Sequence, residues 1–398
     1  MHLRYGMNPH QPAHVSVIGS PPRSGRQASA SEAGPFTVRH GSPSYINILD
    51  ALNAWQLVRE ASHAFGVPAA ASFKHVSPAG AALAGPLDET IRTTYAVDTV
   101  SPVTSAYLRA RDADPKSSYG DFVAVSHPVD RDLANLLKRL TCDGIIAPGY
   151  DDGVLDILAA KKRGTFLVLE ADPDFEPPAE EVRELFGLKL TQHRDTEPLT
   201  RSLLLPDLPD SAARDLLLGL IVLRYTQSNS IAFLKDGMTI GIGAGQQSRI
   251  DCTRLAGQKA DTWWLRRAVT AAAAPPATTA AADSTEPASP DSHKSDPQHN
   301  AAPQLTTSLP LSARINHQLA AVDHLSADDR TTWLAQLTNV AMVSDGAIPF
   351  ADNVEEAHRH GVRHLAEPGG SIRAPEVTAA CAALGITLSQ TGIRLFHH

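Results

Sequence analysis

Two distant stretches of this sequence show the same alternation of short apolar runs and amphipathic segments. Residues 120–169 contain, in order, GDFVAVS, VDRDLANLLKRL, CDGIIAPG and GTFLVL. Residues 344–389 contain SDGAIPF, DNVEEAHRHG, GVRHLAEPGG and GITLS. Short buried strands that alternate with helices are typical of a parallel or mixed sheet covered by helices. The sequence therefore predicts an α/β fold with a duplicated α/β/α unit, the alternative being a chance likeness between generic βαβ segments.

The segments between and before these stretches predict the domain organisation. An apolar helix over 211–225 is followed by the polar string TQSNS and by the glycine-rich GMTIGIGAGQQSR. From Ala268 to about Leu309 the composition falls to Ala, Pro, Thr, Ser, Asp and Gln, which cannot bury enough apolar surface to become ordered. We predict a first unit with its lead-in over 1–205, a central helix and glycine loop over 206–268, a disordered insertion over 269–309 and a second unit over 310–398.

Composition excludes several classes of protein. With 35 Lys and Arg against 43 Asp and Glu, the formal charge of −8 argues against a non-specific nucleic-acid binder. The longest aliphatic run, Leu216–Leu223, is far shorter than the roughly 20 residues of a membrane helix. Three distant cysteines without a CxxC pair indicate neither a disulfide framework nor a zinc site. With no apolar signal core in MHLRYGMNPHQ, we predict a protein of the reducing cytoplasm.

The segment Gly66–Gly80 carries the first candidate site. Apolar residues over 67–73 predict a buried strand, which ends at the adjacent Lys74 and His75. A helix with Ile48, Leu52 and Trp55 on one face is predicted before it. Ligands of open α/β sheets bind beyond strand ends, so the Lys–His pair is a candidate for chemistry. The alternative is two solvated side chains in a turn.

Other polar segments stay ambiguous when taken singly. Gly241, Gly243 and Gly245 lack the GxGxxG spacing of a dinucleotide site and no Walker lysine follows them. They predict either a tight turn at a strand end or a close approach of backbone to a ligand, with Arg249 as an anion donor. Asn229 in TQSNS is either a turn residue or part of a pocket wall.

Taken together, the strings resemble one family, the aminoimidazole carboxamide ribonucleotide (AICAR) formyltransferase module of the bifunctional purine-biosynthesis enzyme. The matches follow one another along nearly the whole chain except the predicted insertion. They are LRYGMNPHQ (3–11), ASFKHVSPAGAA (71–82), SSYGDFVAVS (117–126), IIAPGY (145–150), ELFGLKLTQHR (184–194), RYTQSNS (224–230), IGIGAGQQSRIDCTRLAGQKADTWWLR (240–266), EPGGSIR (367–373) and RLFHH (394–398).

The resemblance implies a fold and a reaction. The fold would be duplicated cytidine-deaminase-like α/β/α units in three layers, without their zinc. The reaction would be transfer of a formyl group from the co-substrate 10-formyltetrahydrofolate to the 5-amino group of AICAR, with Lys74 and His75 as the catalytic pair and Asn229 orienting the reactants. An imidazole suits removal of the amine proton, and an ammonium near the oxyanion is typically worth about 3 kcal/mol.

Further roles follow only from the resemblance. It implies a potassium ion near TQSNS and a homodimer whose active sites are shared between subunits. The residues implied to hold the ribotide are Arg4, Tyr5, Gly149, Asp172, Arg249 and Arg394; the residue implied to meet the folate pterin is Asp352; and the residues assigned to potassium are Thr226, Ser228, Ser230 and Asp345.

Two departures from the family pattern leave alternatives open. The chain begins where the formyltransferase module begins, which predicts a monofunctional enzyme whose product is closed by a separate IMP cyclohydrolase. In SDGAIPFADN, Ala347 and Ile348 stand where family members often carry aromatic residues, and Ala351 replaces an arginine. The rival hypotheses are therefore a related formyltransferase acting on another amino-heterocycle and a non-catalytic ligand-binding homologue.

Overall fold

The computed structural model describes residues 1–17, 34–273 and 309–398, and its main element is a mixed sheet of eleven strands. The strand order is β1-β6-β5-β4-β2-β3-β10-β9-β11-β12-β13. The strands are β1 (Phe36–His40), β2 (Ala69–Lys74), β3 (Ser77–Leu83), β4 (Asp121–Val125), β5 (Cys142–Ala147), β6 (Leu167–Ala171), β9 (Ile231–Lys235), β10 (Met238–Gly243), β11 (Val340–Ser344), β12 (Val362–Glu367) and β13 (Thr387–Gln390).

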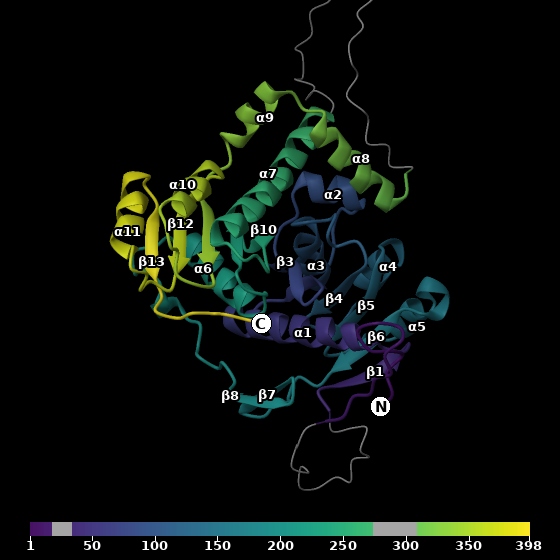
Figure 1. Ribbon diagram of the computed structural model, residues 1–398. Helices are drawn as coiled ribbons and strands as arrows, with labels where there is room; N and C mark the ends of the chain where they lie inside the picture. Colours follow the sequence, from purple (N-terminus) through teal and green to yellow (C-terminus); the bar gives the residue numbers. More distant parts are fainter. Residues whose placement is uncertain (18–33, 274–308) are drawn as a thin grey trace, which may run out of the picture.

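Helices cover both faces of this sheet, and a small hairpin stands apart from it (Figure 1). The helices are α1 (Tyr45–Phe65), α2 (Glu89–Tyr95), α3 (Pro102–Asp112), α4 (Arg131–Arg139), α5 (Val154–Ala159), α6 (Asp210–Arg224), α7 (Arg249–Ala273), α8 (Leu311–Asp323), α9 (Ala327–Leu334), α10 (Asp352–Arg359) and α11 (Ala374–Ala383). The hairpin consists of β7 (Glu180–Leu185) and β8 (Leu188–His193).

Two hydrophobic cores lie on the two faces of the sheet, each between the sheet and a layer of helices. One core joins α1 and α6 to one face of the sheet, through side chains such as Trp55, Phe73 and Leu218. The other joins α2, α3, α4, α5, α7, α8, α10 and α11 to the opposite face, through side chains such as Tyr107 and Phe233. Successive residues of a strand point to opposite faces, so Ala69 and Ala71 lie in the first core while Ala70 lies in the second.

The two halves of the sheet have the same strand order. In the first half the hairpin β2–β3 is followed by the parallel strands β4, β5 and β6. In the second half the hairpin β9–β10 is followed by the parallel strands β11, β12 and β13. The halves join through β3 and β10 at the centre. The prediction of an α/β fold with a mixed sheet is therefore confirmed.

Local signals in the sequence account for the boundaries of α1 and α4. Ser44 caps α1 by accepting from the backbone N–H of Asn47, and Gly66 ends the helix at a φ of 67°. Asp130 caps α4 in the same way, with its side chain accepting from the N–H of Leu133. These caps supply partners for N–H groups that have none within a helix, and both helices lie where the sequence predicts them.

Two boundaries differ from the sequence prediction. The insertion was predicted from residue 269, but α7 continues to Ala273 because Arg266 and Thr270 are still buried against α3 and α8 and because alanine favours helix. The rest of that predicted disorder, residues 274–308, lies outside the described residues. In the second half, β11 ends at Ser344, so the strand precedes the string GAIPF instead of including it.

The surroundings of Gly241 and Gly243 in β10 explain why glycine stands at both positions. A Cβ on Gly241 would lie 2.1 Å from the carbonyl oxygen of Ala256, and one on Gly243 would lie 2.2 Å from that of Cys252. Both carbonyls belong to α7, so these glycines allow the helix backbone to lie directly on the strand. Among the described helices, none is long and apolar enough to cross a membrane.

Candidate active site at the turn end of the sheet

The strand register places the Lys–His pair at one end of the sheet. Phe73 of β2 pairs with Phe122 at the start of β4, so the turn after β2 lies at the amino end of β4 and β5. Ile231 at the start of β9 pairs with Gly243 at the end of β10 and with Ser344 at the end of β11. We call this end, which carries the turn Lys74–Ser77, the turn end of the sheet.

The turn itself is tight and conformationally unusual. His75 and Val76 both adopt the left-handed region, with φ of 55° and 59°. Two-residue hairpin turns of this kind normally carry Asn and Gly, and a β-branched residue there is an outlier. The backbone N–H of Val76 donates to Asp50 Oδ1 of α1 at 2.7 Å, which fixes the turn to the helix. His75 is consequently presented to solvent on a supported backbone.

The environment of the turn includes two further polar groups. Lys74 Nζ donates to the main-chain oxygen of Tyr119 at 2.7 Å, which sets the direction of the lysine side chain. Burial raises the pKa of the Asp50 carboxyl, while the Val76 N–H and the nearby His75 act in the opposite direction. Asp50 therefore holds the Lys–His turn in place although its own carboxylate is largely removed from water.

Asp50→Ala is expected to lower the free energy of unfolding by about 1–3 kcal/mol, because the Val76 N–H loses its only acceptor while Val76 stays in the left-handed region. Adding Val76→Gly should restore about 1 kcal/mol, since glycine adopts this region freely. Urea unfolding of both variants measures the effect, with the exposed Asp207→Ala as control. A single variant as stable as the wild type would contradict the supporting role of Asp50.

A buried polar network lies beside the turn. Arg249, at the start of α7, donates from Nη1 to Asp345 Oδ1 at 2.5 Å and from Nη2 to Asn229 Oδ1 at 2.7 Å. The other oxygen of Asp345 accepts from Ser228 Oγ at 2.6 Å and from the Ser230 N–H at 3.0 Å. Asp345 is fully buried. The network therefore fixes Asn229 by an ion pair whose two members are both removed from solvent.

Backbone contacts join this network to the turn. The N–H of Gln227 donates to Ser77 Oγ at 3.3 Å, and the carbonyl of Gln227 accepts from Gly245. Asn229 Nδ2 donates to the main-chain oxygens of Gln246 and Gln247 at 3.1 and 3.2 Å. Segments 74–77, 226–230 and 244–249 are therefore neighbours, although they are far apart in the sequence.

Four other predicted residues lie toward the same end. Arg4 and Tyr5 reach the start of α1, where the Tyr45 N–H donates to the Tyr5 carbonyl, and Arg4 Nη2 donates to the Tyr5 hydroxyl at 2.9 Å. Arg394 lies over the ring of Phe396 at 4.6 Å in the C-terminal segment, and the next residue, His397, exchanges hydrogen bonds with Ser228. Asp352 is the exposed first residue of α10.

Gly149 and Asp172 do not join this group within one chain. Gly149 follows β5 and Asp172 follows β6, at the carboxyl ends of strands whose amino ends face the turn. The length of β4 alone, five residues, separates the two ends of the sheet by about 15 Å. The structure therefore separates these two residues from Lys74, His75 and Asn229.

The structure brings other residues to the turn that the sequence patterns did not single out. Tyr119 and Gly120 precede β4, and a Cβ on Gly120, which has a φ of 78°, would lie 4.0 Å from Lys74 Nζ. The charge of Asp143, at the start of β5, acts on the Asp50 carboxyl and raises its pKa. The sequence signal for these residues is their place before a buried strand, because β4 runs antiparallel to β2 and its start faces the turn.

The predicted potassium ligands have the oxygen donors that such a site requires. Ser230 Oγ is buried and has no hydrogen-bond partner among the described residues, beside the carboxylate of Asp345. Thr226 is buried, and its hydroxyl donates to the Val222 carbonyl at 2.7 Å, which leaves its lone pairs free to accept. Within residues 1–17, 34–273 and 309–398 no cluster of His, Cys, Asp or Glu has the composition of a transition-metal site.

These features define a mixed α/β protein in which an exposed Lys–His turn and a buried Asn–Arg–Asp network converge at one end of a single sheet. The chain belongs to the AICARFT/IMPCHase bienzyme family, whose profile matches residues 1–259. The resemblance identified from the sequence motifs is thereby confirmed.

Curated relatives support the same assignment over the whole chain. It is 31% identical over 403 residues to the bifunctional purine biosynthesis protein PurH of Roseobacter denitrificans. It is 30% identical over 400 residues to the PurH proteins of Cereibacter sphaeroides and Dinoroseobacter shibae. These alignments cover all of this chain and 59% of each relative, so the chain spans about three fifths of their length.

Proposed function

We propose that this protein transfers a formyl group from 10-formyltetrahydrofolate to the 5-amino group of AICAR. The observation that carries the proposal is the turn end of the sheet, where the turn with Lys74 and His75 contacts the segment of Asn229 through Ser77 and Gln227, in a chain of the AICARFT/IMPCHase family. The two halves of the sheet, each a hairpin followed by three parallel strands, support duplicated cytidine-deaminase-like units as its architecture.

In the proposed mechanism the amine nitrogen of AICAR attacks the formyl carbon. A new C–N bond forms as His75 takes the amine proton, and the bond from the formyl carbon to the folate N10 then breaks as the protonated His75 returns that proton to N10. Lys74 stabilises the oxyanion of the tetrahedral intermediate. The Tyr119 carbonyl that holds Lys74 and the Arg249 side chain that holds Asn229 keep both groups in place.

For the ribotide, we retain the exposed Arg4 and Arg394 and the partly buried Tyr5 as proposed contacts. Arg249 is buried and occupied by Asp345 and Asn229, which favours a positioning role over direct phosphate binding. In place of Gly149 and Asp172, we assign Gly120 and Asp143 as the glycine and acidic residue of the site, since both lie at the turn end. Asp352 stays the proposed contact of the pterin.

Potassium is proposed to be held by Thr226, Ser228, Ser230 and Asp345. The support is the unpartnered buried hydroxyl of Ser230 next to the Asp345 carboxylate. A hard cation favours oxygen ligands such as these. Its contribution would be to hold the segment 226–230, and with it Asn229, in its present conformation.

A homodimer is proposed as the functional unit. The β7–β8 hairpin exposes the apolar side chains Val182, Leu185, Phe186, Leu188 and Leu190, with Phe186 fully exposed. The hairpin projects away from the body of the protein (Figure 1). Two strands alone are marginally stable and an exposed apolar patch of this kind indicates a partner surface, for which a second copy of this chain is our proposal.

The segment 347–351 departs from the family pattern, and its placement helps to decide whether the formyl acceptor is AICAR or another amino-heterocycle. Ile348 is buried in the core and its N–H donates to Glu367 Oε2 at 3.1 Å, so its side chain packs in the interior of the protein. Ala347 is partly buried and Phe350 is 48% exposed, which keeps an aromatic ring in this loop. These placements favour AICAR over another amino-heterocycle.

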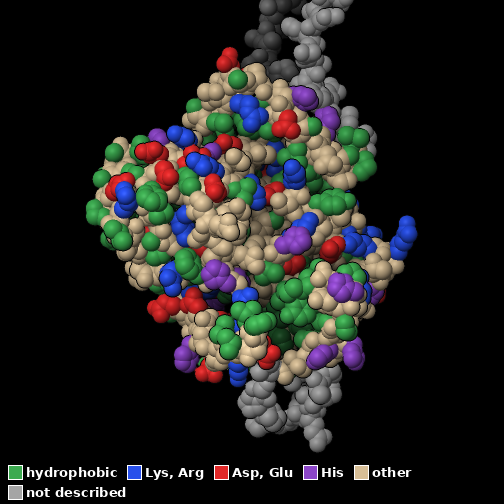
Figure 2. Space-filling view, viewed as in Figure 1, with side chains coloured by type: hydrophobic (Ala, Val, Ile, Leu, Met, Phe, Trp, Pro, Cys, Tyr) green, Lys and Arg blue, Asp and Glu red, His purple; other side chains and the backbone are tan. Residues whose placement is uncertain are grey.

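The remaining proposals concern the surroundings of the protein. Three free and buried cysteines are compatible with the reducing cytoplasm as its compartment. On the face drawn in Figure 2, acidic and basic side chains are intermingled, in keeping with small-molecule substrates rather than a nucleic acid.

A coupled absorbance assay of tetrahydrofolate release, with AICAR as acceptor, tests the proposal. We expect turnover that depends on both substrates, with formyl-AICAR ribotide as product. Binding of both substrates without turnover would favour the non-catalytic homologue. Turnover with a different amino-heterocycle but not with AICAR would favour the related formyltransferase.

A further inference from the structure

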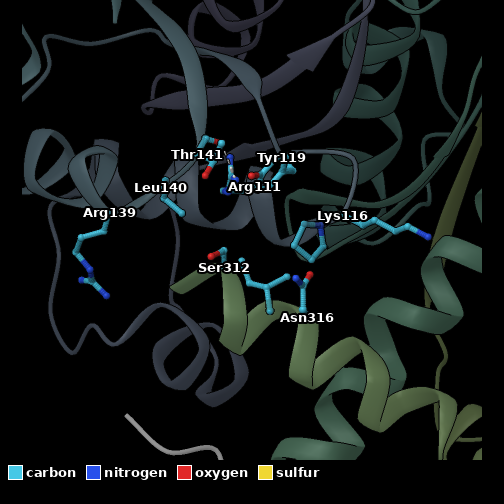
Figure 3. A pocket seen from close by; sticks show the side chains of 10 residues that line it. Arg111, Lys116, Tyr119, Arg139, Leu140, Thr141, Ser312 and Asn316 are labelled. Atoms are coloured by element: carbon cyan, nitrogen blue, oxygen red, sulfur yellow. Dashed lines mark hydrogen bonds between the residues drawn. The ribbon is translucent and has the colours of Figure 1, made fainter. Parts of the chain in front are cut away.

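Residues 117–120, the loop that leads into β4, carry the carbonyl group that orients Lys74. The main-chain oxygen of Tyr119 accepts from Lys74 Nζ at 2.7 Å. The loop borders a cavity of about 320 Å³, and Arg111, Tyr119 and Thr141 lie together on one of its walls (Figure 3). On the cavity side the loop therefore lacks van der Waals contacts with other parts of the protein. The position of the Tyr119 carbonyl depends instead on the polar contacts of the loop.

A buried side-chain network holds the loop where it meets β4. Ser72 Oγ, on β2, lies 2.7 Å from Ser118 Oγ of the loop and 2.7 Å from Asp121 Oδ2 of β4. Asp121 also accepts from the Tyr107 hydroxyl at 3.0 Å and from Arg111 Nη1 at 2.7 Å. All five side chains are at most 2% exposed. The network therefore joins the strand of the proposed catalytic lysine to the loop that orients this lysine.

Arg111 connects this network to the loop a second time. Its Nη2 donates to the Thr141 carbonyl at 3.3 Å, and the same carbonyl accepts from the Gly120 N–H at 3.0 Å. Tyr119 is thus held on both sides, through the side chain of Ser118 before it and through the backbone of Gly120 after it. These two contacts fix the direction of the Tyr119 carbonyl.

The strand register places the network next to the lysine. Ser72 and Lys74 occupy alternate positions of β2, so their side chains leave the strand on the same face of the sheet. Phe73 pairs with Phe122 in the antiparallel ladder of β2 and β4, so Lys74 and Asp121 are the next residues on the paired strands. The buried carboxylate and the lysine are therefore cross-strand neighbours.

We propose that Ser72 and Asp121 are positioning residues, which hold the Tyr119 carbonyl so that the Lys74 ammonium keeps the direction needed to stabilise the oxyanion. The inference rests on the proposed function, from which the role of Lys74 is taken. Both residues are fully buried, so they touch no substrate and act only through the lysine. A buried ion pair such as Arg111–Asp121 is often no more stabilising than an apolar pair, so its value here lies in the exact placement of the loop. An oxyanion donor requires such a fixed direction.

A double-mutant cycle in kcat tests this assignment. Ser72→Ala removes the hydroxyl that joins the loop to Asp121, and we expect kcat to fall about tenfold with little change in the KM of AICAR, since a small displacement of a catalytic group slows the reaction. In the Lys74→Gln background the same change should have no further effect, because it acts only through the lysine. Ser389→Ala is the matched control, because it removes a buried hydroxyl from β13 at the edge of the sheet and should leave kcat unchanged.

Chemical labelling of Lys74 decides the inference independently of turnover. Acetylation of Lys74 by acetic anhydride, followed by peptide mass spectrometry, should be several-fold faster in Ser72→Ala, because the amine is released from the Tyr119 carbonyl, while the exposed Lys138 should react at an unchanged rate. An equal fall of kcat with and without Lys74 in an active enzyme would overturn the positioning role while the formyltransferase proposal stands, and so would an unchanged labelling rate. An inactive protein with faster labelling of Lys74 in Ser72→Ala would overturn the proposed function alone.

Discussion

Replacing His75 by alanine is expected to lower the rate of the proposed formyl transfer by about 10²- to 10⁴-fold, the usual contribution of a general base. The side chain is exposed and carried by a turn whose backbone is held by Asp50, so its loss should leave the fold intact. Steady-state kinetics with saturating donor and acceptor measure the effect, which should fall on kcat with little change in the KM of AICAR.

The exposed His63→Ala variant on α1 serves as the matched control, since it removes an imidazole from the same helix that carries Asp50. Lys74→Gln should also be slow, by about 10²- to 10³-fold, because the oxyanion loses a charged donor. A His75→Ala enzyme with wild-type kcat would assign the proton transfer to another group and reduce His75 to a surface residue.

The fold is largely readable from sequence because its elements depend on local signals. The caps Ser44 and Asp130, the αL glycine at 66 and the apolar runs that became β2 and β5 are all local features. The end of α7 at Ala273 is determined by non-local contacts, because Arg266 and Thr270 are buried against helices that are distant in the chain. The pairing of β3 with β10, which joins the two halves, is likewise a tertiary contact.

In the candidate site, too, some residues could be identified from local sequence and others only from tertiary contacts. Lys74, His75 and Asn229 are polar residues at the ends of apolar segments, and in the structure their two segments are in contact through Ser77 and Gln227. Gly149 and Asp172 also follow apolar strands, but the antiparallel pairing of β2 with β4 turns those strand ends away from the Lys–His turn. The place of Gly120 and Asp143 before buried strands is visible in the sequence, but only the register of the sheet shows that the starts of these strands face the Lys–His turn.

The burial of Arg249 changes the role that is inferred for this residue. As an arginine after a glycine-rich loop it reads as an anion donor, and such a role requires an accessible guanidinium. In the structure it is 8% exposed and joins Asp345 to Asn229. Its charge is balanced inside the protein by Asp345, whereas Arg4 and Arg394 are exposed at the turn end.

Asp345→Ala is expected to lower the free energy of unfolding by about 3–5 kcal/mol, because it leaves the buried Arg249 guanidinium without its counter-charge. Denaturant unfolding measures this loss. Turnover should fall as well, since Asn229 is positioned by Arg249. The exposed Asp352→Ala variant is the control for stability, as its carboxylate contacts only Asn353 among the described residues.

The double variant Arg249→Met/Asp345→Leu separates the cost of an unpaired charge from the value of the pair. Removing both charges should recover most of the lost stability, because an apolar pair of similar volume avoids the desolvation of two ions. Turnover should not recover with it, since Asn229 Oδ1 would still lack its donor. If the double variant regained both stability and full activity, the network would be dispensable for catalysis, and Asn229 would have to be oriented by the Gln246 and Gln247 carbonyls alone.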